Sequence, residues 1–235
     1  MKKVIKAAVL AGTPVDTMMG VTYLQKKNDE PDSEGILIEP LYRPVAESCD
    51  AQVRFQYSDQ GGKREVLDNI FDSEIEQGVQ DFFIYCNSLS GSFSFDTYAL
   101  EKSLESDMDI RIYTPLQVYR RLGAGYSRIG VMAANNLSAH AIEEALMTAN
   151  PDIYVIGTGN MAIVRAIEDG CTPEEIVKIC RLKEMASYME ACGAEAIIIG
   201  CTHFPYFMDE LAKVTKLPLV DPAEEMYKAL VNADI

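Results

Sequence analysis

The chain has 235 residues, of which 48% are hydrophobic and 24% are charged, and its net charge at pH 7 is −15. This length accommodates one large core or two small α/β domains. The acidic balance argues against partners such as nucleic acid or an anionic membrane surface, because both require a basic footprint. An anionic substrate would therefore be held by local donors such as backbone N–H groups and hydroxyls.

No apolar run is long enough to cross a bilayer; the run 197–199 is typical of the longest. Met1 leads through two lysines into a strand-like segment, without the apolar region of a secretion signal. We therefore expect a cytoplasmic protein with reduced cysteines.

Short apolar strands alternate with amphipathic helices along the chain. The helix predicted over 63–77 has its apolar residues on one face and ends at Gly78. A second helix is predicted over 138–148, and a third begins at Thr172 with an N-cap and capping-box pattern and ends at Gly193. Strands are predicted over 4–10, 35–40, 81–85, 128–133, 153–156 and 196–199. Strands separated by helices favour an α/β fold with mainly parallel sheets flanked by helices.

Two segments share one layout. Residues 78–88 and 193–203 each contain a helix-ending glycine, a buried strand, a cysteine eight residues after the glycine, and two polar residues. The strand 7–11 also matches the strand 129–133. The pattern predicts two related halves.

The six cysteines form no C-x-x-C pair, and we interpret four of them as small core residues: Cys49, Cys171, Cys180 and Cys192. Cys86 and Cys201 differ, because each follows a predicted strand. Ligands of open α/β sheets bind beyond the carboxyl ends of the strands, where backbone N–H groups can stabilise a thiolate. These two residues are therefore candidate acid/base thiols.

Polar side chains follow each candidate thiol. Asn87 and Ser88 follow the first, and Thr202 and His203 follow the second. In an extended chain His203 lies on the same side as Cys201, where an imidazolium would lower the pKa of the thiol or help to protonate an enolate. The alternative is a structural histidine that bonds the turn backbone. We expect no metal, because a lone C-x-H lacks the third and fourth ligands.

These residues resemble a known family. Tyr-Cys86-Asn-Ser resembles the first cysteine motif of the aspartate/glutamate racemase superfamily, and Gly-Cys201-Thr-His-Phe-Pro resembles its second motif in the form of glutamate racemases. The segments 54–57 and 167–170 are similar to a substrate-side loop and to a segment carrying an auxiliary carboxylate. The resemblance implies two pseudo-symmetric α/β domains, 1–113 with 207–235 and 114–206, with the active site in the cleft between them.

The resemblance also implies the chemistry. One thiolate removes the α-proton of an amino acid and the opposite thiol returns a proton to the other face, without pyridoxal phosphate or any other cofactor, and without a metal. The implied catalytic residues are Cys86, Cys201 and His203. The implied substrate-binding residues are Gly12, Thr13, Tyr57, Asn87, Ser88, Asn135, Asn136 and Thr202, and the candidate auxiliary acids are Asp16 and Glu168.

Two segments depart from the family pattern. Residues 11–17 stand where glutamate racemases carry Asp-Ser-Gly, and Asp16 lies further along the chain than that acid. Gly12-Thr13-Pro14 is similar instead to the glycine-rich turn of aspartate racemases. Asn135 and Asn136 stand where threonines would bind a carboxylate. The substrate therefore stays open between glutamate, aspartate and a related carboxylate.

The sequence thus predicts an isomerase, an amino-acid racemase, and the resemblance implies a homodimer. Three alternatives remain: a related isomerase or decarboxylase with the same carbanion-stabilising site, a thiol hydrolase, and a non-catalytic small-molecule binding protein of this fold. A decarboxylase would need only one of the two cysteines. A hydrolase would use a Cys–His pair.

Overall fold

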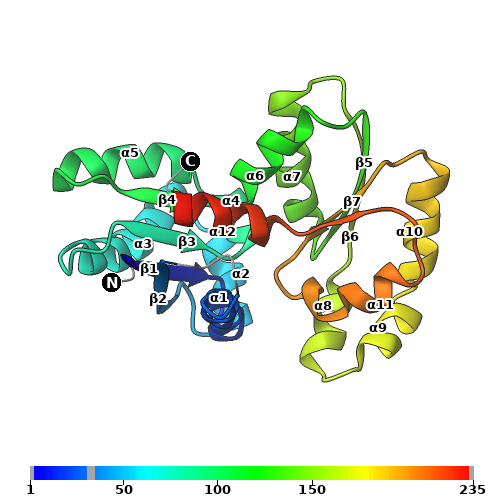
Figure 1. Ribbon diagram of the computed structural model, residues 1–235, viewed down its shortest axis with the longest axis horizontal. Helices are drawn as coiled ribbons and strands as arrows, with labels where there is room; N and C mark the ends of the chain where they lie inside the picture. The colour runs from blue at the N-terminus through cyan, green and yellow to red at the C-terminus, as the bar shows by residue number, and fades with distance from the viewer. Residues whose placement is uncertain (1–2, 31–34, 233–235) are drawn as a thin grey trace. The chain divides into compact units, whose positions relative to one another are not determined.

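The chain forms two compact units in the computed structural model, which describes residues 3–30 and 35–232 without the side chain of Cys49. The first unit is Met1–Pro115 with Ala223–Ile235, and the second is Leu116–Pro222. Each contains a four-stranded sheet whose strands are all parallel, in the orders β2-β1-β3-β4 and β6-β5-β7-β8 (Figure 1). The predicted α/β class and the two similar halves are confirmed.

The first unit alternates strands and helices. Its strands are β1 (Lys3–Ala11), β2 (Ile36–Pro44), β3 (Asp81–Ile84) and β4 (Arg111–Tyr113), and its helices are α1 (Pro14–Lys27), α2 (Cys49–Tyr57), α3 (Gln60–Ile75), α4 (Asn87–Ser92), α5 (Phe95–Ser106) and α12 (Pro222–Asn232). Both faces of the sheet are apolar, because parallel strands are covered by helices on both sides.

Successive residues of the central strands point to opposite faces. On one face Phe82 of β3 stacks on Phe71 of α3, with ring centroids 3.9 Å apart, and Leu10 of β1 belongs to the same buried cluster. On the other face α1 packs so closely that a Cβ at Gly20 would lie 2.8 Å from side-chain atoms of both Val9 and Tyr85. The two packed faces fix the strand ends that carry the site.

The second unit repeats the scheme. Its strands are β5 (Arg128–Ala133), β6 (Tyr154–Gly159), β7 (Ile197–Gly200) and β8 (Leu219–Val220), and its helices are α6 (Pro115–Gly123), α7 (Asn136–Ala149), α8 (Met161–Glu168), α9 (Pro173–Ile179), α10 (Leu182–Ala191), the 3-10 helix η2 (Phe204–Phe207) and α11 (Met208–Ala212). Ile199 of β7 packs with Ile176 of α9 on one face, and Ile198 packs with Ile142 of α7 on the other.

The strand registers show how closely the two halves correspond. In the second sheet Ala133 of β5 pairs with Gly200 of β7, and Cys201 follows directly. In the first sheet the Tyr85 N–H donates to the Leu10 carbonyl (2.8 Å), which continues the β1–β3 pairing by one residue, and Cys86 follows directly. Each cysteine therefore leaves its sheet at the same point.

Three details differ from the sequence predictions. The helix predicted from Thr172 to Cys192 is two helices, because Arg181 adopts a left-handed conformation (φ 57°) that ends α9 and redirects the chain into α10. The strand predicted over 35–40 continues to Pro44, since β2 is an edge strand and tolerates proline. The domain boundary predicted at 207 lies at 223, because β8 pairs with β7 in the second unit.

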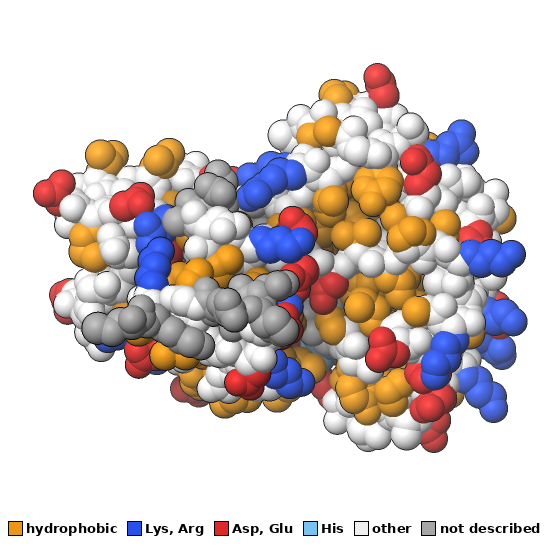
Figure 2. Space-filling model, in the orientation of Figure 1, with side chains coloured by type: hydrophobic (Ala, Val, Ile, Leu, Met, Phe, Trp, Pro, Cys, Tyr) orange, Lys and Arg blue, Asp and Glu red, His pale blue; other side chains and the backbone are white. Residues whose placement is uncertain are grey.

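Charged side chains are mixed on the surface. On the face shown in Figure 2, lysines and arginines are scattered among acidic side chains over both units. Among the described helices, none is long and apolar enough to cross a membrane. On this face the surface shows no broad basic area.

Candidate active site

Cys86 lies at the carboxyl end of β3, where it caps the start of α4. Its side chain is buried, with 4% exposed. The backbone N–H groups of Gly12, after β1, and Leu89, in the first turn of α4, both act to lower the pKa of this thiol. The end of the neighbouring strand and the start of the helix therefore both direct donors at this thiol.

Side chains of α2 complete the surroundings of Cys86. The Cys86 Sγ lies 3.3 Å from the Ser88 Oγ, and the Gln52 Nε2 donates to the sulfur over 3.8 Å. The Ser88 Oγ accepts hydrogen bonds from the Gln52 Nε2 (3.4 Å) and the Gln56 Nε2 (2.9 Å). Gln52 and Gln56 are four residues apart and share one face of the helix.

Opposing effects act on the acidity of this thiol. Burial raises the pKa of the Cys86 thiol above its ordinary value, and the negative charge of Asp16 raises it further. Hydrogen bonds from the Ser88 hydroxyl and from the N–H groups of Leu89 and Gly12 lower the pKa in turn. The site therefore holds a thiol whose ionisation depends on its hydrogen-bond donors.

The loop after β1 brings Gly12 and Asp16 to this thiol. Thr13 is the N-cap of α1: its Oγ1 accepts the Asp16 N–H (3.3 Å), and its carbonyl accepts the Thr17 hydroxyl (2.8 Å). Gly12 is required here by close approach, because a Cβ at this position would lie 1.8 Å from the Gln52 Nε2. The buried Asp16, with 4% exposed, is placed by the first turn of α1.

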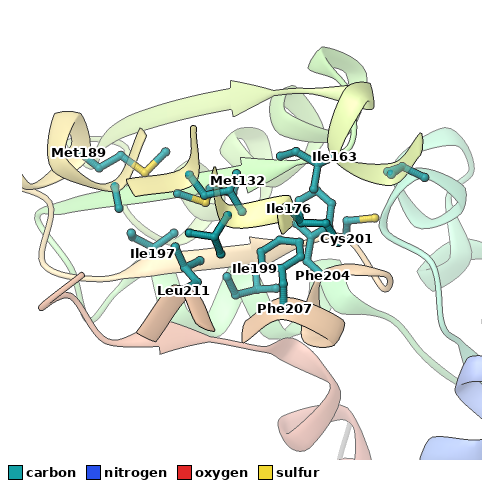
Figure 3. Packing of buried hydrophobic residues seen from close by; sticks show 14 of the residues in the cluster. Met132, Ile163, Ile176, Met189, Ile197, Ile199, Cys201, Phe204, Phe207 and Leu211 are labelled. Atoms are coloured by element: carbon teal, nitrogen blue, oxygen red, sulfur yellow. The ribbon is translucent and has the colours of Figure 1, made fainter. Parts of the chain in front are cut away.

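Cys201 follows β7 in the second unit, and 8% of it is exposed. Its sulfur lies 3.7 Å from the His203 Nδ1, and the His203 Nε2 lies 3.8 Å from the Glu168 Oε1 at the end of α8. Figure 3 shows Cys201 at the margin of the buried cluster, beside Ile163 and Phe204. The three polar side chains form a row of thiol, imidazole and carboxylate.

Close packing shapes the ends of the strands around Cys201. A Cβ at Gly200 would lie 2.9 Å from the Met132 carbonyl oxygen and 2.6 Å from the Ile142 Cδ1. After β5, Asn135 caps α7 and its Oδ1 accepts the Ser138 N–H (2.8 Å). Because Gly200 has no side chain, the end of β7 can pack closely against β5 and α7.

The structure gathers most of the predicted residues into two groups. Gly12, Asp16 and Ser88 lie around Cys86, and His203 and Glu168 accompany Cys201. Asn87 is buried directly after the first cysteine and Thr202 is half-buried directly after the second, whereas Asn136 is exposed. Thr13 and Asn135 act as helix caps.

Tyr57 is 77% exposed, and the structure does not bring it to Cys86. Two other side chains of α2 belong to this site, and no sequence motif singled them out: Gln52 donates to the Cys86 sulfur, and Gln56 donates to the Ser88 hydroxyl. A signal for them was present: Ser48 is an N-cap whose Oγ accepts the Ala51 N–H, and two glutamines follow at helical spacing.

Three of the other cysteines were predicted to be core residues but lie only half-buried, packed against the core of the second unit: Cys171, Cys180 and Cys192. The side chain of Cys49 lies outside the described part of the chain. Within residues 3–30 and 35–232, no three His, Cys, Asp or Glu side chains are grouped in a way that could hold a metal ion.

Comparisons with known proteins point to one family. Residues 114–230 match the family model described as Asp/Glu/Hydantoin racemase. A glutamate racemase of Limosilactobacillus reuteri (strain DSM 20016) is 26% identical over 156 residues, which are 64% of this chain and 55% of that relative. The chain thus spans little more than half the length of this curated relative.

Solved structures share the fold. The glutamate racemase from Francisella tularensis subsp. tularensis SCHU S4, in complex with D-glutamate, is similar with a TM-score of 0.68 and 20% identity over 97% of this chain and 80% of that chain. An aspartate racemase homologue from Pyrococcus horikoshii OT3 is similar with a TM-score of 0.62 and 15% identity over 99% of each chain.

Proposed function

Because the chain belongs to the aspartate/glutamate racemase superfamily, we propose that it is a cofactor-independent racemase of a small acidic amino acid. Glutamate and aspartate are the two candidate substrates, and the cytoplasm is the proposed location. The complex of the Francisella tularensis relative with D-glutamate supports an acidic amino acid.

One observation carries the proposal: two cysteines leave two similar sheets at equivalent points, and each has its own polar partners. Cys86 contacts the Ser88 hydroxyl and the Gln52 amide. Cys201 lies beside His203, which in turn lies beside Glu168. A single nucleophilic thiol would not need this duplication, whereas a reaction with one acid and one base does.

In the proposed reaction both thiols serve one substrate. The thiolate of one cysteine removes the α-proton, and the resulting carbanion is protonated on the opposite face by the thiol of the other cysteine. Each turnover therefore exchanges the protonation states of Cys86 and Cys201 and leaves the protein ready for the opposite enantiomer. His203 would act beside Cys201 as a local proton donor or acceptor, held by Glu168.

The substrate carboxylates are proposed to bind to neutral donors. Asn87, Ser88 and Thr202 directly follow the two cysteines and supply amide and hydroxyl groups. Asp16 would bind the ammonium group of the substrate, because its carboxylate lies close enough to act on the Cys86 thiol. Neutral donors suit a protein with a net charge of −15.

The test is proton exchange in D2O. The L- and D-forms of glutamate and aspartate are incubated with the protein, and the α-proton is followed by NMR while chirality is measured. We expect exchange together with racemisation. Carbon dioxide release would support the decarboxylase instead, and absence of turnover with all four acids would contradict the proposed substrates.

Single variants test the two-base assignment. Cys86→Ser and Cys201→Ser should each lower racemisation by about 10²–10⁴-fold, and each should still exchange the α-proton of one enantiomer, a different one in each variant. Cys192→Ser is the matched control, because this half-buried cysteine lies at the end of α10, and it should keep the parental rate. Racemisation at the parental rate by either active-site variant would overturn the assignment.

A further inference from the structure

The Ser88 hydroxyl lies at the centre of a small network. Two side-chain amides of α2 donate to its oxygen: the Gln56 Nε2 over 2.9 Å and the Gln52 Nε2 over 3.4 Å. The Cys86 Sγ lies 3.3 Å away. Three side chains, two from α2 and one from the end of β3, therefore contact the Ser88 hydroxyl.

The number of hydrogen-bonding groups decides the direction of the last bond. A serine hydroxyl has one hydrogen to donate and two lone pairs to accept. The two glutamine amides occupy both lone pairs, so the oxygen cannot also accept the S–H of a neutral thiol. The hydroxyl hydrogen remains, and its nearest remaining partner in this network is the Cys86 sulfur.

We infer that Gln52 and Gln56 are positioning residues that turn the Ser88 hydroxyl toward the Cys86 sulfur and thereby favour the thiolate. Gln52 also donates to the sulfur directly over 3.8 Å, whereas Gln56 acts through Ser88 alone. A thiolate accepts these bonds strongly and the sulfur of a neutral thiol accepts them only weakly, so the arrangement stabilises one protonation state.

Other groups around the Cys86 sulfur disfavour its thiolate, and the hydrogen-bond network acts against them. Asp16, from α1, places a negative charge near it, and burial disfavours the thiolate. The Gly12 and Leu89 N–H groups act in the same direction as Ser88. The inference rests on the proposed function only in naming Cys86 as a base, and its test requires no turnover.

The experiment measures the acidity of Cys86 itself. The full-length protein is alkylated with iodoacetamide over a range of pH, and the peptide that contains Cys86 is quantified by mass spectrometry. The midpoint of the rate profile reports the pKa of this thiol and does not depend on how easily the reagent enters. In Gln56→Met, which keeps the length of the side chain but cannot donate, we expect the midpoint to move up by about one unit.

The chain provides a matched control. The Gln60 Nε2 donates to the Ser92 carbonyl (3.5 Å), so this glutamine also contacts α4 but does not touch Ser88. Gln60→Met should leave the Cys86 midpoint unchanged. The Cys201 profile, read from the same samples, should be unchanged in every variant and shows that the protein is folded.

A double variant separates positioning from general disturbance. In a Ser88→Ala background, Gln56→Met should cause no further shift, because the hydroxyl that it orients is gone. Gln56→Glu should raise the midpoint more than Gln56→Met, since its carboxylate accepts the Ser88 hydrogen and adds a negative charge. The inference is overturned if Gln56→Met leaves the Cys86 midpoint at the parental value, or shifts it equally with and without Ser88. Loss of racemase activity with an unmoved midpoint would contradict this inference alone.

Discussion

Replacing Gly12 with alanine adds one methyl group at a point where the backbone meets a functional side chain. The new Cβ would lie 1.8 Å from the Gln52 Nε2 and 2.2 Å from its Cδ, whereas a close ordinary contact is 3.4 Å. The amide must therefore withdraw by about 1.6 Å, the difference between these two distances. Because Gln52 is flexible at this end, the side chain moves and the backbone stays.

The withdrawal costs Cys86 a donor. Hydrogen bonds from the Gln52 Nε2 to the Cys86 sulfur (3.8 Å) and to Ser88 (3.4 Å) would both exceed hydrogen-bonding range. The pKa of the thiol, already raised by burial and by Asp16, should rise further by about one unit, so that about tenfold less thiolate is present at neutral pH. The free energy of unfolding should change by less than about 1 kcal/mol.

The assay pairs the peptide-resolved alkylation profile of Cys86 with a urea unfolding curve. Gln52→Ala should give a similar shift, and adding Gly12→Ala to it should give none, because the shortened side chain leaves room for the methyl group. Gly61→Ala in α3 is the control, since a Cβ there has only an ordinary contact at 3.4 Å. A Gly12→Ala protein that loses several kcal/mol of stability, or keeps the parental Cys86 profile, would refute this reasoning.

Two further predictions concern the ion pairs. Lys102→Met should lower the free energy of unfolding, measured with urea at neutral pH, by about 1–2 kcal/mol, because the buried ammonium pairs with three partly exposed carboxylates. Lys228→Met is the control: it removes an exposed ion pair and should lower the free energy of unfolding by less than about 0.5 kcal/mol. Burial acts to raise the pKa of Asp68, but hydrogen bonds from Lys102 and Tyr98 lower it below the ordinary value. The stabilisation by the Lys102–Asp68 pair is therefore present at neutral pH and is lost as the pH falls through the pKa of Asp68 in the folded protein. A Lys102→Met protein that loses as much stability at low pH as at neutral pH would contradict this prediction. Glu168→Gln should lower the racemisation kcat by about tenfold by removing the carboxylate beside the imidazole, while the exposed Glu144→Gln, next to the other histidine, should leave it unchanged.

The sheets were the most predictable part of the molecule. Buried parallel strands are short, almost wholly apolar runs, and the glycines that end the preceding helices mark where each run begins. Gly78 and Gly193 both have φ of 81°, a conformation that glycine adopts without strain. The strand ends, and with them the positions of Cys86 and Cys201, follow from local patterns alone.

The side chains around the cysteines were less predictable because they come from distant segments. Gln52 reaches Cys86 only because α2 packs beside α4, and α2 is only weakly amphipathic in sequence. The resemblance instead singled out Tyr57, which lies on the exposed side of the same helix. The break at Arg181 was hidden for a similar reason: a left-handed arginine has no sequence signature, whereas a glycine at such a position would mark the break.

The two halves share their strand registers and differ in the loops and helices that follow the strands. Strand registers are fixed by packing on both faces of a sheet, so the point at which a cysteine leaves the sheet is the same in both units. The loops and helices that follow are at the surface and can vary. Cys86 has therefore acquired uncharged donors, Ser88 and Gln52, whereas Cys201 has an ionisable partner, His203. A two-base reaction starts each turnover with one cysteine as the thiolate and the other as the thiol. Two cysteines with different hydrogen-bonding partners can adopt these two protonation states more readily than two cysteines in identical surroundings.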